Sequence, residues 1–252
     1  MSEQEPSKFQ TGQIILIDKP LTWTSFDVVN KARWLIKNEI NVKKIKVGHA
    51  GTLDPLATGL LIVCTGKFTK RIDELQAQEK EYTGVITLGA TTACYDLEKE
   101  VDIEYPTNHI TEAMIKEMAL SFIGEQEQTA PIHSAKKIDG KRAYEYAREG
   151  EEVKIKSNTI NIKEFDVELC DAPIYEVQTE EKPKINREQP YQKGINVKFR
   201  IVCTKGTYIR AIARDFGERL NSGGHLSELR RTRIGEYKIE DAFKMEDINL
   251  LF

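Results

Sequence analysis

The most chemically suggestive feature of this sequence is one aspartate in a glycine-rich loop. Asp54 lies in "VGHAGTLDPLATG" (residues 47–59), five positions after His49. A hydrolytic metal site needs several histidine or carboxylate ligands close together, and only His49 stands near Asp54. The loop also lacks the GK[ST] ending of a phosphate-binding loop. On this stretch alone, an aspartate that caps an amide in a turn is the simplest explanation.

A lone carboxylate can still do chemistry at a sugar carbon. In glycosidases, a carboxylate attacks the anomeric centre or stabilises its positive charge, while a second carboxyl group manages protons and water. A reaction that breaks one glycosidic bond and forms another without water does not need the second group. Asp54 is therefore a candidate nucleophile or electrostatic stabiliser for such a reaction.

The composition is that of an ordinary globular protein. The 252 residues are 40% hydrophobic and 31% charged, and the formal net charge is −3. No run of about 18 apolar residues and no signal-peptide pattern occur, so we expect a cytoplasmic protein that does not enter the membrane. We expect a flexible N-terminal tail over residues 1–11. The four cysteines read as buried free thiols: Cys64, Cys94, Cys170 and Cys203.

The positive charge is concentrated in four short runs, although the chain as a whole is acidic. These basic runs occupy residues 31–46, 134–148, 205–214 and 230–233. Any single run is more often a solvated face than a binding site. Because each run stands beside glycine, serine or an aromatic residue, the four together are equally consistent with a face that binds phosphates.

The periodicity of apolar residues predicts more strands than helices. Strands are expected over residues 12–20, 59–66, 80–96 and 194–204, and two more within 153–170. Helices are expected over 22–39, 109–124, 142–150 and 207–220. Because the two kinds of element do not alternate regularly, we predict an α+β fold, with a large mixed, mainly antiparallel sheet flanked by helices. A polar surface loop is expected near residues 174–193.

Several stretches together resemble the TruB family of tRNA pseudouridine synthases. "GHAGTLDPLATGLL" is similar to the catalytic motif of that family, and further matching segments follow in the family's order over residues 12–245. They are "DKPLTWTSFDVV", "KEYTGVITLGATTACYD", "QTAPIHSAKKIDGKRAYEYAREG", "CTKGTYIRAIARDFG" and "GGHLSELRRTRIGEY". The resemblance implies the pseudouridine synthase fold and conversion of uridine 55 in the T loop of tRNA to pseudouridine. It implies no metal and no other cofactor.

The resemblance also assigns roles to four residues. Asp54 would be the essential carboxylate, acting at C1′ of the flipped nucleotide either as a nucleophile or by assisting formation of a glycal. Arg210 would pair with Asp54, because a neighbouring guanidinium favours the ionised carboxylate. Tyr82 would stack on the flipped uracil, and Tyr208 would be a second pocket aromatic that helps to move the proton at C5. Without the family, each has an ordinary structural explanation.

Four further residues would support this site. Leu229 would line the pocket, and His49 would stack on or wedge into the RNA as the base leaves its stack. Lys19 and Pro20 would support the geometry of the site more than its chemistry. The expected partner is the T-arm stem-loop of tRNA, and we expect the enzyme to be a monomer. The best phosphate-contact candidates are the basic residues within 31–46, 136–142 and 230–233.

Two departures from the family pattern and two alternatives stay open. Ala130 stands where the family usually has proline, and the chain stops soon after "GEYKIEDAFKMEDI". We therefore expect a single catalytic domain over residues 12–252, without a separate C-terminal RNA-binding domain. One alternative function is a non-catalytic tRNA-binding protein that helps tRNA to fold through the same pocket. The other is synthase activity on a different RNA.

Overall fold

A computed structural model describes residues 6–134, 136–151, 153, 155–171 and 193–251. The chain divides into two compact units. Unit 1 contains Met1–Tyr82 and Arg230–Phe252, and unit 2 contains Thr83–Leu229. None of the described helices is both long and apolar enough to span a membrane. The surface loop expected near residues 174–193 lies almost wholly outside the described residues.

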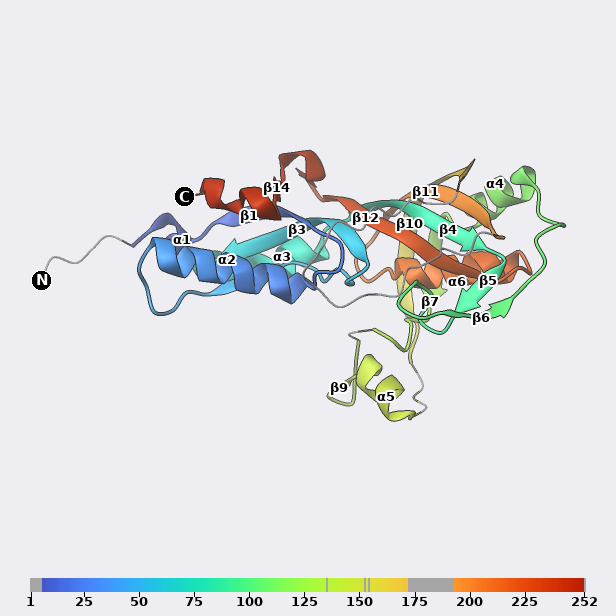
Figure 1. Ribbon diagram of the computed structural model, residues 1–252, viewed down its shortest axis with the longest axis horizontal. Helices are drawn as coiled ribbons and strands as arrows, with labels where there is room; N and C mark the ends of the chain where they lie inside the picture. Colours follow the sequence, from blue (N-terminus) through green and yellow to red (C-terminus); the bar gives the residue numbers. More distant parts are fainter. Residues whose placement is uncertain (1–5, 135, 152, 154, 172–192, 252) are drawn as a thin grey trace, which may run out of the picture. The chain divides into compact units, whose positions relative to one another are not determined.

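The described strands form one large sheet and two small ones (Figure 1). In the ten-stranded sheet the order is β14-β1-β3-β12-β4-β11-β10-β7, with β2 paired to β3 and β13 paired to β12. The β1–β14 pair is parallel, whereas β1–β3, β2–β3, β12–β13, β10–β11 and β7–β10 are antiparallel. Strands of the large sheet are β1 (Ile14–Lys19), β2 (Val47–His49), β3 (Ala57–Thr65), β4 (Lys80–Leu88), β7 (Gly124–Gln128), β10 (Asn158–Cys170), β11 (Ile195–Cys203), β12 (Gly224–Ile234), β13 (Tyr237–Lys238) and β14 (Phe243–Lys244). The predicted α+β class with a mainly antiparallel sheet is confirmed.

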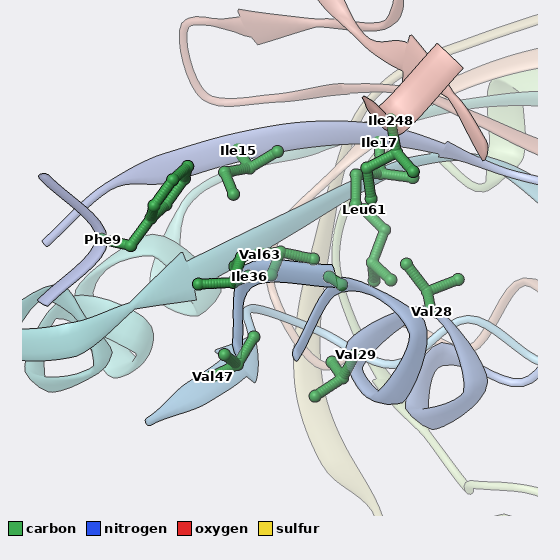
Figure 2. Packing of buried hydrophobic residues seen from close by; sticks show 11 residues of the cluster. Phe9, Ile15, Ile17, Val28, Val29, Ile36, Val47, Leu61, Val63 and Ile248 are labelled. Atoms are coloured by element: carbon green, nitrogen blue, oxygen red, sulfur yellow. The ribbon is translucent and has the colours of Figure 1, made fainter. Parts of the chain in front are cut away.

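Unit 1 packs helices against β1 and β3. Its helices are α1 (Lys8–Thr11), α2 (Ser25–Glu39) and α3 (Ile72–Ala77), with 3₁₀ turns at Gly66–Arg71, Ile239–Asp241 and Met245–Leu251. Helix α2 begins at a capping box, in which the Thr24 hydroxyl accepts from the Asp27 amide and the Asp27 carboxylate accepts from the Thr24 amide. Figure 2 shows Val28 and Val29 of α2 in the cluster that also contains Leu61 of β3. The predicted apolar face of this helix is therefore its core face.

Unit 2 is held by a cluster of four aromatic rings. Phe165 lies edge-on to Phe122 and Phe199, and its ring centroid is 5.7 Å from that of Phe216. Phe122 directly follows α4 (Glu112–Ser121), Phe165 and Phe199 belong to β10 and β11, and Phe216 belongs to α6 (Ile209–Arg219), so burial of their apolar area stabilises the unit. The remaining elements of this unit are α4 (Glu112–Ser121), α5 (Ala143–Glu149), α6 (Ile209–Arg219), and the small paired strands β5 (Ala90–Thr92) with β6 (Val101–Glu104) and β8 (Lys137–Ile138) with β9 (Lys141–Arg142).

Three local expectations differ from the structure. Residues 8–11 of the expected tail form α1, because Phe9 is buried in the core of unit 1 and Gln10 caps the Ser7 amide. Residues 158–170 form one strand, β10, instead of two strands. Residues 158–162 of this strand pair with β7 on one edge, and residues 162–170 pair with β11 on the other edge, with a register shift in the β11 pairing between Ile162 and Glu164. No strand was expected over β12, whose pattern is obscured by the buried polar side chains of His225 and Arg231.

Candidate active site

Asp54 lies in the loop that joins β2 to β3 in unit 1. The loop closes on itself, because the Ala57 amide donates to the Asp54 carbonyl oxygen at 3.1 Å. The Ala50 amide donates to Ile62 O of β3 at 2.9 Å. At Gly59, φ is +102°, and a Cβ atom would come within 2.3 Å of the Arg231 carbonyl oxygen. Only glycine readily adopts this positive φ and leaves room for the Arg231 carbonyl oxygen, so the backbone geometry explains the glycine at position 59.

The Ser25 hydroxyl fixes the peptide groups next to Asp54. Its Oγ accepts from the Leu53 amide at 2.8 Å and donates to the Leu53 carbonyl oxygen at 3.1 Å. Ser25 is buried in the first turn of α2, and Leu53 is buried immediately before Asp54. One side chain therefore satisfies both polar groups of one buried residue. The helix start and the loop are fastened together at the position before the carboxylate.

The Lys19 ammonium holds the other side of the loop. Lys19 ends β1 and is fully buried, and its Nζ donates to Trp23 O at 2.6 Å, Pro20 O at 3.0 Å and Pro55 O at 3.4 Å. The Thr22 amide also donates to Pro55 O, at 2.9 Å. Burial lowers the pKa of Lys19 to about 7, Asp54 opposes this shift, and Arg231 adds to it. The supporting role predicted for Lys19 and Pro20 remains a prediction, and these bonds are its physical basis.

We expect the buried Lys19 to make the free energy of unfolding increase with pH above neutrality. Because its pKa is about 7 in the folded state and 10.5 in the ordinary state, the unfolded chain holds more protons between these values. The free energy of unfolding then rises with pH across this window, by up to about 1.4 kcal/mol per pH unit. Urea unfolding of wild type and Lys19→Met at pH values from 6 to 10 measures the contribution of Lys19 to the free energy of unfolding. Their difference should be flat below pH 6.5 and grow above pH 7, and parallel profiles would contradict the assignment.

Arg231 of β12 is a buried cation directly behind the loop. Its side chain is almost fully buried, and it donates from Nε to Leu60 O at 2.8 Å and from Nη2 to Gly51 O at 3.0 Å. Such bonds are necessary, since a buried charge without partners is costly. Together, Ser25, Lys19 and Arg231 hold the carbonyl groups of Leu53, Pro55 and Gly51. They hold the backbone on both sides of Asp54 in one conformation.

His49 and Tyr82 are the other predicted pocket residues of unit 1. His49 ends β2, and burial lowers the pKa of its ring, with a further lowering by Arg231. The uncharged ring is thus favoured at neutral pH, which suits a stacking role. Tyr82 lies in β4 and is buried.

Unit 2 contains the remaining predicted residues, and Gln128 orients one of them. Tyr208 is the N-cap of α6 and is half-buried. The Tyr208 amide donates to Gln128 Oε1 at 2.8 Å, and Gln128 Nε2 donates to Tyr208 O at 3.1 Å. Leu229 is a half-buried residue of β12. Gln128 was not expected from the sequence to act near the site.

Arg210 lies in the first turn of α6 and is 6% exposed. Its Nε is 3.5 Å from Oδ2 of the buried Asp96, its Nη1 donates to Cys94 O at 3.1 Å, and its Nη2 donates to His133 O at 2.9 Å. Asp96 also accepts from the Cys94 thiol at 2.9 Å and from the Glu98 amide at 3.0 Å. Asp96 was not among the residues expected from the sequence, although it ends the quoted tyrosine-containing segment. Pairing of Arg210 with Asp54 stays a prediction.

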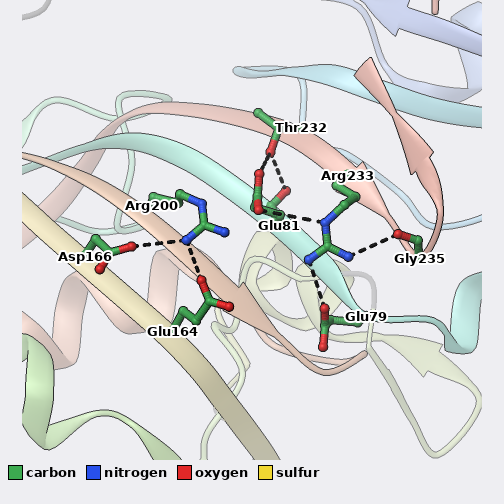
Figure 3. A network of polar contacts seen from close by, with 8 residues as sticks. All are labelled: Glu79, Glu81, Glu164, Asp166, Arg200, Thr232, Arg233 and Gly235. Atoms are coloured by element: carbon green, nitrogen blue, oxygen red, sulfur yellow. Dashed lines mark hydrogen bonds and ion pairs between the residues drawn. The ribbon is translucent and has the colours of Figure 1, made fainter. Parts of the chain in front are cut away.

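Ion pairs within the protein change the interpretation of one basic run. In unit 1, Arg233 pairs with Glu79 at 2.9 Å, and Arg230 pairs with Asp18 at 2.7 Å (Figure 3 for Arg233). Because Arg231 is buried as well, residues 230–233 offer less free charge than their sequence suggests, and their role as phosphate contacts stays a prediction. In unit 2, Figure 3 shows Arg200 between Glu164 and Asp166. Within unit 1, Thr232 Oγ1 donates to Glu81 (Figure 3).

Within the described part of the chain, no three histidine, cysteine, aspartate or glutamate side chains are grouped so that they could hold a metal ion. The cysteines are free thiols in the same residues, with Cys64, Cys94 and Cys203 buried and Cys170 partly exposed. The expectation of buried thiols is therefore confirmed for three of them. Burial raises the pKa of Cys64 and of Cys94 to about 11, so both are protonated at neutral pH.

Comparisons with known proteins point in one direction. The model described as "TruB family pseudouridylate synthase (N terminal domain)" matches residues 37–209, and "tRNA pseudouridylate synthase B C-terminal domain" matches residues 210–252. A tRNA pseudouridine synthase B of Parabacteroides distasonis is 51% identical, covering 96% of this chain and 93% of the relative. The tRNA pseudouridine synthase B of Flavobacterium johnsoniae is 50% identical, and the match covers 94% of this chain and 94% of that relative.

Solved structures give the same fold. The structure titled "Crystal Structure of a Cbf5-Nop10-Gar1 Complex" contains a chain with a TM-score of 0.62 and 28% identity, covering 96% of this chain and 54% of that one. "Structure of H/ACA RNP bound to a substrate RNA containing 2'-deoxyuridine" contains one with a TM-score of 0.60 and 26% identity, covering 96% and 53%. This chain thus spans about half the length of those two solved chains.

Proposed function

Because this chain belongs to the TruB family of pseudouridylate synthases, we propose that it isomerises uridine 55 in the T loop of tRNA to pseudouridine. The observation that carries the proposal is the identity of about half of all residues with tRNA pseudouridine synthases along nearly their whole length. In the reaction, the N1–C1′ bond breaks and a C5–C1′ bond forms. C5 loses its proton and N1 gains one, so no atom is added or removed.

Asp54 is the group that acts at C1′ in this proposal. Its carboxylate either attacks C1′ directly or assists loss of a neighbouring proton to give a glycal, and both routes need a fixed carboxylate. The hydrogen bonds that Ser25, Lys19 and Arg231 make to the surrounding backbone support such an arrangement. A positioned group lowers the barrier because orientation is already achieved before the reaction.

The other predicted residues handle the charge and the base. Arg210 pairs with Asp54 and keeps it ionised, Tyr82 stacks on the extruded uracil, and Tyr208 helps to move the C5 proton. Leu229 lines the pocket beside the base. His49 occupies the place in the stack that the flipped nucleotide leaves, and the uncharged ring favoured by its lowered pKa supports that role.

The wider proposal concerns the partner and the cellular setting. The enzyme acts as a monomer in the cytoplasm, without a small-molecule cofactor, and binds the T-arm stem-loop by shape and phosphate contacts. Exposed lysines after α2 supply part of the positive charge for this contact. They are Lys43, Lys44 and Lys46, and none of the three has a carboxylate within ion-pair distance among the described residues.

The position of the product tests the proposal. Purified enzyme is incubated with an unmodified tRNA transcript, and pseudouridine is mapped by carbodiimide adducts that stop reverse transcription. We expect a stop adjacent to position 55 and none in a transcript with cytidine there. A stop confined to another loop would identify a different RNA substrate. No stop together with tight binding would favour the non-catalytic tRNA-folding function.

A further inference from the structure

Two large aromatic side chains are exposed on one helix of unit 1. Phe26 is 59% exposed and Trp34 is 58% exposed, and both belong to α2. A single exposed apolar side chain is ordinary, whereas two large exposed rings on the same helix form a feature that needs an explanation. Val28 and Val29 face the core in Figure 2, so the aromatic residues occupy the rest of the helix circumference.

Cations accompany both rings. The Arg33 guanidinium carbon lies 5.8 Å from the centroid of the Phe26 ring, and Lys31 Nζ lies 5.4 Å from that of Trp34. Arg33 is also held by hydrogen bonds to Asn30 Oδ1 at 2.7 Å and to Val47 O at 3.1 Å. Phe26, Arg33 and Trp34 follow the spacing of i, i+7 and i+8 on a helix, so they lie on one side of α2. We call Phe26, Lys31, Arg33 and Trp34 the α2 face.

Positive charge continues from the α2 face into the segment that follows the helix. Lys43, Lys44 and Lys46 are exposed, and neither they nor Lys31 lie within 4.0 Å of a carboxylate in the residues the structure describes. The arginines of 230–233 differ, since Arg230 and Arg233 are paired and Arg231 is buried. The exposed lysines of α2 and of the segment after it are therefore more accessible to a phosphate than the arginines of 230–233.

The α2 face begins beside the candidate active site. Ser25, the residue before Phe26, bonds both polar groups of Leu53, the residue before Asp54. An RNA that delivers a nucleotide to Asp54 must pass close to this loop. A helix of 15 residues that starts there extends about 22 Å from it, which is the length of several nucleotides.

We propose that the α2 face binds the tRNA outside the reacting nucleotide, with a base or ribose stacked on Trp34 or Phe26 and phosphates at Lys31 and the following lysines. This inference rests on the proposed function for the identity of the RNA. Rings interleaved with cations are the combination that binds RNA strands, because each base offers a flat face and each phosphate a negative charge. A protein partner would be better served by a continuous apolar patch, which the cations interrupt.

Trp34 itself reports the interaction. The chain has two tryptophans, so Trp23→Phe leaves Trp34 as the single fluorophore. Titration of this variant with an unmodified T-arm stem-loop and with full-length tRNA should quench Trp34 emission at saturation. Trp34→Ala in the wild-type background should raise Kd and KM about tenfold while kcat at saturating RNA stays unchanged. Lys31→Gln should reduce the slope of log Kd against log salt by about one.

Matched substitutions on another helix control for general effects of surface change. Leu120→Ala removes a side chain of α4 that is 65% exposed, and Lys116→Gln removes a lysine that pairs with Glu112. Both should leave Kd within twofold of wild type. If wild type turns over the RNA, but Trp34→Ala has the Kd of wild type and RNA does not quench Trp34 emission in Trp23→Phe, RNA binding by the α2 face is refuted and the proposed function stands. Absence of turnover by wild type would instead count against the proposed function.

Discussion

Replacing Asp54 with asparagine is expected to abolish turnover, by about 10⁴-fold or more, and to leave RNA binding within about threefold. The amide keeps the size of the carboxylate but cannot attack C1′ or accept a proton there. Because the loop is held through backbone groups of Gly51, Leu53 and Pro55, its conformation should survive the change. Single-turnover kinetics and filter binding with a T-arm stem-loop measure the two properties separately.

The matched control makes the same chemical change at an exposed carboxylate of unit 1. Asp73 lies in the first turn of α3, and Asp73→Asn should leave both turnover and Kd unchanged. Turnover by Asp54→Asn above about one hundredth of the wild-type rate would exclude an essential carboxylate at this position. A loss of binding equal to the loss of turnover would show that the substitution disturbs the loop instead.

Removing the Arg210 guanidinium is expected to reduce both stability and turnover. In Arg210→Ala, the buried Asp96 loses its cation, and the Cys94 and His133 carbonyl oxygens lose their donor. Breaking a buried ion pair costs about 3–5 kcal/mol of unfolding free energy. We expect kcat to fall by about 10²–10³, a loss of the size seen when one preorganised electrostatic group is removed. Urea unfolding and single-turnover kinetics give the two values.

A second substitution separates the two effects of Arg210. Asp96→Asn removes the carboxylate that Arg210→Ala leaves uncompensated, so the double variant should regain part of the lost stability. Turnover should not return, because Arg210 is proposed to pair with Asp54 as well. Recovery of turnover in parallel with stability would show that Arg210 serves only the fold. Arg210→Lys should give intermediate turnover, since it keeps the charge but loses the planar fork.

The parts of the fold that could be predicted are those with a clear period. Val28, Val29, Ala32 and Ile36 repeat at helical spacing, and the core face of α2 follows from them. The strict alternation from Ile195 to Cys203 likewise identifies β11. The strand β12 escaped prediction because two of its inward side chains are polar. His225 and Arg231 are buried only because distant carbonyl groups accept their hydrogen bonds.

In the site, too, local sequence patterns could be interpreted, whereas contacts between distant residues could not be predicted. The chemistry open to Asp54 could be argued from its neighbours and from what they lack, and the family motifs supplied the substrate. Ser25, Gln128 and Asp96 could not be found in this way. Each acts through a partner at least 28 positions away in the sequence, as in Ser25 with Leu53 and Gln128 with Tyr208. Such pairings depend on which strands lie side by side, and a single sequence does not give that order.

Tritium release from C5 tests the central claim most directly, because forming a bond between C5 and C1′ must displace the hydrogen at C5. The substrate is a T-arm stem-loop that carries [5-³H]uridine only at position 55, and a second stem-loop carries the label at another loop uridine. Both are incubated with wild-type enzyme in the presence of EDTA. We predict release that approaches one tritium per molecule from the first RNA and none from the second. Tight binding of the first RNA without any release would contradict the account.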